Sequence, residues 1–314
     1  MLTCPMRWLL KAAAQKVLGA APGGTSANYL LQRHVTRTLP RDDTAFRGKA
    51  RRAVQHFDAF REHGATPPEQ PRFYEFGPGW DFVIALTYRA LGVGQQTLVD
   101  VARVARLELV NDTLAKFDRL RDDLAEEFER PLQPLGPSIS SLDELRERFG
   151  ITYLAPRDAR ATGLADASVD FVSSSVTLEH VPQGDVGPLL RECRRILRPD
   201  GLMSCTIDMK DHFAPFDRTL SPYNFLRFES RTWRLLSSPL NHQNRLRYPD
   251  YLALFRSAGF DVVTERVVEP SPQDLEVLRR LPLAQPFRTG YTLEELGVKY
   301  ASLVVRPARS PDAL

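Results

Sequence analysis

Short apolar runs alternate with longer stretches of helical periodicity from residue 72 onward, and this alternation limits the fold more than any other feature. Glycine, proline or aspartate bounds each apolar run, as is typical of buried strands. The runs predict seven strands, at residues 72–76, 96–101, 151–155, 169–174, 201–208, 261–268 and 301–306. Strands that alternate with helices along the chain favour an α/β fold with a doubly wound sheet.

The last two predicted strands are joined differently from the others. Residues 248–257 predict a helix before them, because Tyr251 and Phe255 belong to an apolar face and Gly259 supplies the stop. No amphipathic run of helix length closely links the last two strands. Because parallel neighbours need a crossover connection, we expect the last strand to be antiparallel.

The composition excludes several classes of protein. The chain has 314 residues, enough for one large domain or two small ones, and its 43% hydrophobic and 26% charged residues are typical of a soluble globular protein. No apolar run reaches the roughly 18–20 residues that a membrane span needs. Three cysteines without CxxC spacing predict neither a disulfide scaffold nor a structural zinc site. Because Arg7, Lys11 and Lys16 interrupt the N-terminal apolar stretch, we expect a cytoplasmic protein without a secretory signal.

Three segments do not belong to the minimal sheet. Residues 1–70 predict a basic helical segment that precedes the main domain. Within that domain, at 71–314, residues 103–150 predict a helical insertion and residues 209–247 an aromatic and basic segment that covers the substrate.

Charge is distributed unevenly among these segments, although the net charge is only +3. Residues 1–70 hold 11 basic and 5 acidic side chains, residues 209–247 hold 7 and 3, and residues 103–150 hold 8 and 11. Concentrated basic charge favours an anionic partner, such as a phosphate-bearing substrate or lipid headgroups, and a solvated face is the alternative. Nucleic acid is not an expected partner, because no RNA-binding signature accompanies the charge.

A glycine-containing turn follows the first predicted strand, in the sequence Phe73-Tyr-Glu-Phe-Gly-Pro-Gly-Trp-Asp81. Glycines let a ligand approach the backbone closely, and the helix that follows offers free N–H groups, so a nucleotide-like ligand is implied. Asp100 ends the second strand, where an acidic side chain can accept both hydroxyl hydrogens of a ribose; a helix cap is the alternative. Phe82 occupies the position of the third glycine of a dinucleotide fingerprint, which disfavours NAD.

The order of these motifs resembles that of class I S-adenosylmethionine-dependent methyltransferases of the type 11 group. The matching residues are Glu75 to Gly79, Asp100, Asp158-Ala159, the run Ser168-Val-Asp-Phe-Val-Ser-Ser-Ser-Val-Thr-Leu-Glu-His-Val181 and the later run from Leu189 to Gly201. The resemblance covers roughly residues 72–208, and the strands that follow complete the family's sheet. The chain departs from the family in its insertion after Asp100 and in having Asp200 where glycine is frequent.

This resemblance implies a Rossmann-like fold with S-adenosylmethionine as the cofactor. The methionine part would contact the glycine turn, and Asp100 would hold the ribose. Asp158 and the backbone of Ala159 would read the adenine, and a serine at the end of the fourth strand would close the pocket. The implied cofactor-binding residues are Glu75, Phe76, Gly77, Pro78, Gly79, Asp100, Asp158, Ala159, Ser174 and Ser175.

Candidate general bases follow the fourth and fifth predicted strands, at the edge where open α/β sheets bind ligands. His180 and His212 have an ordinary pKa that suits proton removal at neutral pH, and Asp208 and Asp211 closely precede the second histidine. The alternatives are a structural role for His180 and an ordering role for the later loop. A metal site is not expected, because neither an HExxH nor a Cys/His spacing accompanies these residues.

Candidate acceptor-binding residues lie in the segment 209–247. Tyr223 and Trp233 could stack on a sugar or planar ring, and Arg227 and Arg247 could bind a carboxylate or phosphate. The alternative is an amphipathic cover in which the aromatic side chains simply pack.

The sequence therefore predicts a methyltransferase that acts on a small-molecule or glycan-like acceptor, at oxygen. The alternative is a non-catalytic module of the same fold that docks an anionic partner or a membrane surface and has a filled cofactor cleft. Peripheral membrane contact through residues 1–18 is a further hypothesis, because Trp8 and several leucines accompany the basic residues there.

Overall fold

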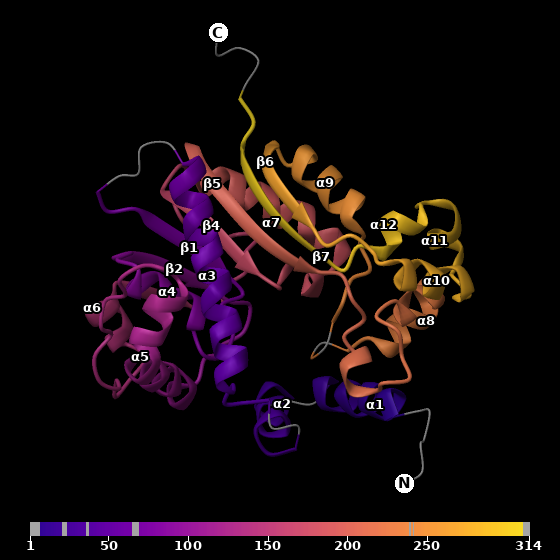
Figure 1. The fold of residues 1–314 in the computed structure, drawn as a ribbon, viewed down its shortest axis with the longest axis horizontal. Helices are drawn as coiled ribbons and strands as arrows, with labels where there is room; N and C mark the ends of the chain where they lie inside the picture. Colours follow the sequence, from indigo (N-terminus) through magenta and orange to yellow (C-terminus); the bar gives the residue numbers. More distant parts are fainter. Residues whose placement is uncertain are drawn as a thin grey trace.

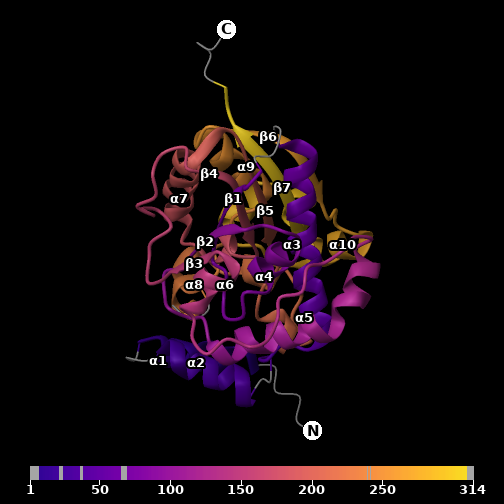
Figure 2. The ribbon, with the colours of Figure 1, turned by 90° about the vertical axis from the view of Figure 1, so that its left-hand side faces the viewer.

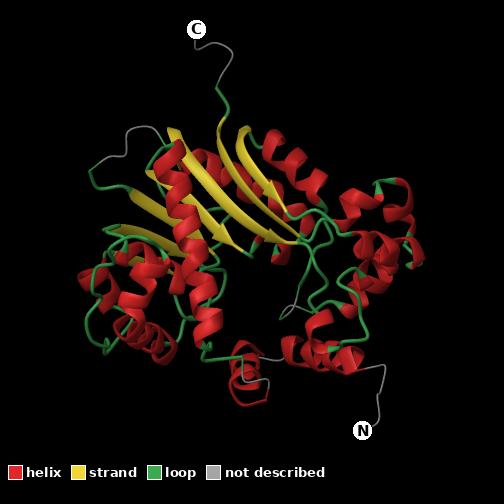
Figure 3. Ribbon diagram, viewed as in Figure 1, coloured by secondary structure: helices red, strands yellow, loops and turns green. Residues whose placement is uncertain are grey.

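A computed structural model describes residues 7–20, 24–35, 38–64, 69–238, 240 and 242–309. The strands form one sheet in the order β3-β2-β1-β4-β5-β7-β6, and β7 is antiparallel to both of its neighbours. All seven predicted strands are confirmed, as is the antiparallel last strand (Figure 3). Their bounds are β1 (Arg72–Phe76), β2 (Gln95–Val99), β3 (Ile151–Leu154), β4 (Val169–Ser175), β5 (Leu197–Asp208), β6 (Phe260–Val267) and β7 (Tyr300–Pro307).

Helices cover both faces of the sheet (Figure 1). On one face, α7 (Gln183–Ile196) and α9 (Tyr248–Ser257) bury apolar side chains against the strands. The predicted helix at 248–257 corresponds to α9. On the other face lie α3 (Asp43–His63) and α4 (Val83–Ala90). The strand order reverses between β1 and β4, which creates a ligand-binding crevice at the carboxyl ends of these strands.

The helix α3 belongs to the core, although the sequence assigned it to a separate N-terminal segment. Ala53 and Phe60 are buried against Phe73 and Phe171 of the sheet. The Phe60 and Phe73 rings meet edge to face, with centroids 5.0 Å apart. Sequence periodicity alone could not tell whether this amphipathic helix packs on the sheet or lies beside it.

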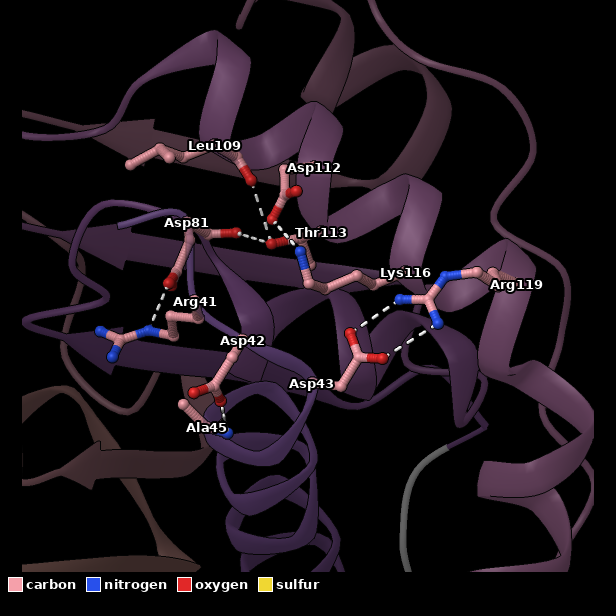
Figure 4. Close-up of polar contacts among 10 residues, drawn as sticks. All are labelled: Arg41, Asp42, Asp43, Ala45, Asp81, Leu109, Asp112, Thr113, Lys116 and Arg119. Carbon is pink, nitrogen blue, oxygen red and sulfur yellow. Dashed lines mark hydrogen bonds and ion pairs between the residues drawn. The ribbon is translucent and has the colours of Figure 1, made fainter. Parts of the chain in front are cut away.

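The predicted insertion contains α5 (Leu107–Glu127) and α6 (Glu144–Phe149). It packs against α3, and ion pairs in both directions join the two segments. Arg47 forms ion pairs with Asp123 and Glu127, both at 2.9 Å. Arg119 pairs with Asp43 at 2.7 Å (Figure 4). Part of the basic charge of residues 1–70, which suggested an anionic partner, is therefore neutralised by ion pairs within the molecule.

The N-terminal helices α1 (Arg7–Ala20) and α2 (Gly24–Leu30) continue into a π-helix at Leu31–Val35 and lie away from the sheet (Figures 1 and 2). The Trp8 side chain is 7% exposed, and its ring centroid lies 5.5 Å from that of Phe213 and 5.7 Å from that of Phe228. Trp8 is thus packed within the protein, contrary to its expected availability for a membrane surface. Residues 1–6 and the side chains of Leu10, Val17 and Leu18 lie outside the described parts.

Residues 209–247 contain the short helices η3 (Ala214–Phe216), η4 (Asn224–Arg227) and α8 (Ser230–Leu236). The connection between β6 and β7 holds three more short helices that the sequence did not predict, α10 (Pro272–Arg280), α11 (Gln285–Thr289) and α12 (Leu293–Gly297). Ser271 with Asp274 and Thr292 with Glu295 form the capping boxes that begin α10 and α12. Each helix is too short to give a clear periodic signal. Among the described helices, none has the length and apolarity required to cross a membrane.

Candidate active site

A cleft of about 690 Å³ opens at the carboxyl ends of β1, β2 and β4. Its lining contains most of the residues that the resemblance assigned to the cofactor. These are Phe76, Gly77, Pro78, Gly79, Asp100, Asp158, Ala159 and Ser175. The cleft also reaches His180 and Tyr300, so the ends of β1 and β2 share one space with residues beyond β4 and at the start of β7.

Glycine occupies the two positions of the turn for different structural reasons. Both adopt positive φ angles, +70° at Gly77 and +78° at Gly79, which favour glycine. A Cβ at Gly77 would collide with the Thr177 side chain, so this glycine is required by packing. A Cβ at Gly79 would meet only Lys49 Nζ, at 4.0 Å. The open space beside Gly79 therefore leaves the backbone accessible to a ligand.

The turn is anchored to α3 through Asp81. Arg41 Nε lies 2.6 Å from one carboxylate oxygen of Asp81, and the Thr113 hydroxyl donates a hydrogen bond to the Asp81 carbonyl (Figure 4). Lys49 Nζ lies 2.9 Å from the other carboxylate oxygen. Burial alone would raise the pKa of Asp81, but the two cations outweigh it and lower that pKa to about 2. The glycine turn is thus held by residues far away in sequence.

Two further carboxyl groups lie at or below this end of the cleft. Glu75 is 3% exposed on β1 and is not part of the lining; burial raises its pKa to about 8, and Oε2 has no partner among the described residues. Asp100 lines the cleft, and burial raises its pKa to about 6 although its carboxylate accepts a hydrogen bond from the Ala102 N–H. Val101 beside it is 76% exposed. An acceptor for hydroxyl groups, an apolar surface and an accessible glycine backbone fit a nucleoside-containing cofactor.

The candidate adenine-binding residues and the two candidate serines differ in their access to the cleft. Asp158 lines the cleft, but Arg160 binds its carboxylate at 2.7 Å. Because side chains alternate along a strand, only one of the serines faces the cleft. Ser175 does so and bonds His56 Nε2 at 2.8 Å, whereas Ser174 is 1% exposed and lies outside the lining. The structure therefore favours Ser175 over Ser174 as the residue that closes the pocket.

Of the four candidate bases, only His180 lines the cleft. Its Nδ1 lies 2.7 Å from the His242 carbonyl oxygen, so Nδ1 carries the proton and Nε2 is left as an acceptor. The His212 ring lies 4.9 Å from the His180 ring, between centroids, and burial lowers the pKa of His212 to about 3. That pKa makes His212 a weak base at neutral pH.

The two aspartates mainly order the loop after β5. Asp208 accepts a hydrogen bond from the Lys210 N–H at 2.9 Å and lies 3.8 Å from His212 Nε2. Asp211 is 1% exposed and accepts hydrogen bonds from the Phe213 N–H at 2.7 Å and from Asn224 Nδ2 at 3.2 Å. The buried position of Asp211 disfavours contact with an acceptor.

The four candidate acceptor-binding residues do not line the cleft, which corrects their expected positions. Arg247 is 0% exposed and donates hydrogen bonds to the carbonyls of Met209, Leu296 and Val298. The Tyr223 hydroxyl donates to the Gly297 carbonyl, and Trp233 Nε1 donates to the Gln243 carbonyl. Arg227 is exposed and lies over the Phe228 ring. The Tyr223 hydroxyl, the Trp233 indole N–H and the two terminal guanidinium nitrogens of Arg247 are bonded within the protein, as the alternative of a packed cover predicts. The buried Arg247 Nε has no partner among the described residues.

Arg52 is the cleft residue that sequence reasoning missed. Four cationic side chains from Lys and Arg line the cleft, and three of them are paired: Arg41 and Lys49 with Asp81, and Arg160 with Asp158 and Asp185. Arg52 forms no ion pair or hydrogen bond with a described residue, and its buried Nε is unpartnered. No sequence signal marks it, because its position depends on how α3 docks.

Residues 137–205 match a family model described as a methyltransferase domain, from the loop before α6 into β5. No curated protein matches the chain.

Several solved structures are similar in fold. A 1,6-didemethyltoxoflavin-N1-methyltransferase of Burkholderia thailandensis is 14% identical, with 98% of this chain and 92% of that chain covered and a TM-score of 0.46. An S-adenosylmethionine-dependent methyltransferase of Mesorhizobium loti is 15% identical, with 82% and 97% covered and a TM-score of 0.41. The cyclase SpnF is 17% identical, with 82% and 81% covered and a TM-score of 0.44. Similarity this low carries no conclusion about the reaction.

The family match and the order of the strands agree with the motifs of the sequence, and the cofactor of this family is S-adenosylmethionine. A family model that matches residues 137–205 thus confirms the resemblance to class I S-adenosylmethionine-dependent methyltransferases of the type 11 group.

Proposed function

We propose that this methyltransferase acts at an oxygen atom of a small-molecule or glycan-like acceptor that carries an anionic group. One observation supports the proposal most directly: His180 and Arg52, which has no ion pair with a described residue, line the same cleft as Gly79 and Asp100. The cofactor residues and two side chains suited to an acceptor therefore share one space.

Methyl transfer requires little from the protein beyond positioning the acceptor. A sulfonium methyl group is already activated, so its transfer needs an in-line approach of the nucleophile and exclusion of water. His180 Nε2 can accept a hydrogen bond from an acceptor hydroxyl, because Nδ1 is directed to the His242 carbonyl. That contact would orient the oxygen without requiring a strong base.

The position of Arg52 favours an acceptor that carries an anionic group. A guanidinium presents paired donors that match a carboxylate or a phosphate, and it is more effective where water is partly excluded. The alternative of a non-catalytic module predicts a filled cleft, whereas the space beside Gly79 is open.

Cofactor binding and transfer are tested separately. In calorimetry, S-adenosylhomocysteine should bind the wild type, and Asp100→Asn should weaken binding about tenfold or more because a charged hydrogen-bond acceptor is lost. Asp118→Asn, an exposed carboxylate on α5, is the matched control. Incubation with methyl-labelled donor and fractionated metabolites should then label an anionic hydroxyl compound. Absence of heat with the wild type would reject the cofactor site, and label found only on nitrogen or carbon would reject the oxygen assignment.

A further inference from the structure

Three potential metal ligands meet where the loops after β4 and β5 come together. Glu179 and His180 lie in the short 3₁₀ helix η2 (Leu178–His180), and His212 follows β5. One ligand atom of each side chain lies within 4.8 Å of the other two. The rings of His180 and His212 are tilted by 54° with their centroids 4.9 Å apart.

Glu179 has an unsatisfied oxygen at this point. The residue is 1% exposed, and Oε1 accepts a hydrogen bond of 3.3 Å from the Asp208 N–H. Oε2 is buried and has no partner among the described residues. Burial raises the pKa of this carboxyl well above its usual range. A buried carboxyl oxygen without a donor is costly, and a bound cation would satisfy it.

At least one of the two histidines is oriented for ligation. The Nδ1–H of His180 donates to the His242 carbonyl, which fixes the tautomer and leaves the lone pair of Nε2 free. Histidines that bind metals usually donate their other ring N–H in this way. His212 Nε2 lies 3.8 Å from Asp208 Oδ2, so a further carboxylate stands beside the group.

We propose that Glu179, His180 and His212 form a binding site for a divalent transition-metal cation such as Zn²⁺ or Co²⁺. Two imidazoles and one carboxylate suit such ions, and three protein ligands leave further coordination positions open. His180 also lines the cleft, so an open position is accessible from the acceptor side.

The cation would have a role in the proposed reaction as well. With the cation bound, His180 Nε2 would ligate the cation instead of the acceptor hydroxyl. A hydroxyl bound to the cation would then lose its proton more readily, which would replace a strong general base. This role rests on the proposed function, whereas the binding of the metal does not.

The experiment measures metal binding by the full chain without a histidine tag, after treatment with a chelator. Co²⁺ is titrated and followed by visible absorption, and Zn²⁺ is titrated by calorimetry. The wild type should bind one equivalent of each, and Glu179→Gln and His212→Asn should each weaken binding by more than about tenfold. His34→Asn, in the π-helix Leu31–Val35 and exposed, is the matched control and should bind as the wild type does.

Two further measurements keep the outcome decisive. Circular dichroism checks the fold of each variant; if Glu179→Gln does not fold, His212→Asn decides, because its side chain is 19% exposed. S-adenosylhomocysteine binding is measured on the same metal-free preparations. Failure of the wild type to bind one equivalent, or unchanged binding by the variants, would overturn the metal site. If cofactor binding persists in that case, the proposed function stands.

Discussion

Arg52 is the residue whose charge has the clearest consequence for acceptor choice. It is the cleft cation without an ion pair among the described residues, so removing its charge should affect the acceptor rather than the fold. We predict that Arg52→Met raises the KM for an anionic acceptor about tenfold or more, since a charge-assisted hydrogen bond is lost. Steady-state kinetics with the acceptor found by labelling measures this, alongside calorimetry with S-adenosylhomocysteine.

The neighbouring arginine provides a matched control. Arg51 pairs with Glu127 at 2.5 Å on the outer side of α3, so Arg51→Met should leave the KM unchanged. An unchanged KM for Arg52→Met, or a large loss of S-adenosylhomocysteine affinity instead, would show that the guanidinium does not bind the acceptor.

His56 should make the protein sensitive to acid. Its ring nitrogens lie 2.7 Å from Ser204 Oγ and 2.8 Å from Ser175 Oγ, and burial lowers its pKa to about 3. The unfolded chain, with a histidine pKa near 6.5, binds more protons below that pH, so stability is lost as pH falls. At pH 4.5 the loss from this residue is about 3 kcal/mol.

Thermal unfolding at pH 7 and pH 4.5 tests this origin of the acid sensitivity. His56→Gln should lose less stability than the wild type between the two pH values, because its side chain does not titrate. His34→Gln, at an exposed position, should follow the wild type. An equal loss for His56→Gln and the wild type would contradict the prediction.

At the scale of single residues, most of the residues that the sequence assigned to the cofactor line the cleft, whereas those that it assigned to the acceptor do not. Gly77, Gly79 and Asp100 follow strands directly, so local patterns place them. Glu179, His180 and His212 come from two different loops, and no regular spacing in the sequence indicates that they meet. Arg247 was expected at the acceptor because an arginine that binds carbonyls inside the protein looks the same in sequence as one that faces a cleft.

At the scale of elements, α1 is held by an aromatic cluster formed with residues 209–238. Trp8 packs against Phe213 and Phe228, and Lys16 Nζ donates to the Leu235 carbonyl at 2.7 Å. We predict that Trp8→Ala lowers the free energy of unfolding by about 3 kcal/mol, since a large buried ring is removed. Urea denaturation measures the loss.

The control variant is Leu30→Ala on the next helix, α2. The Leu30 side chain is 53% exposed and should contribute little to the free energy of unfolding. Liposome flotation is run in parallel. If Trp8→Ala left stability unchanged and reduced flotation, the ring would serve a membrane surface rather than the aromatic cluster.

Elements were predictable where their signal is local. The strands and α9 follow from short apolar runs and helical periodicity, and the structure confirms them. The role of α3 was missed because its apolar face is equally consistent with packing on the insertion or on the sheet, and it does both. The helices between β6 and β7 were missed because capping boxes, not periodicity, mark them.

At the scale of the whole molecule, ion pairs join α3 to the insertion. Besides the pairs of Arg47, Arg130 pairs with Asp58 at 2.5 Å. Each exposed pair stabilises by at most about 1 kcal/mol and is screened by salt. We predict that raising NaCl from about 0.02 M to about 0.5 M lowers Tm by about 2–4 °C, which corresponds to about 1 kcal/mol.

The double variant Arg47→Gln/Arg51→Gln identifies the source of this salt effect. It should have a lower Tm at low salt and a weaker dependence on NaCl. Arg61→Gln is the control on the same helix, because Arg61 forms no ion pair with a described residue. A salt dependence equal to that of the wild type would assign the effect to other charges.

The order β5-β7-β6 has a consequence for how the chain folds as it is synthesised. Among the described strands, β6 pairs only with β7, which is made after it and lies between β5 and β6. Until β7 leaves the ribosome, β5 has an open edge and β6 has no neighbour to pair with. Open edges promote association between nascent chains. Synthesis of β7 closes this gap, and because Tyr300 at its start also lines the cleft, the complete site forms only then.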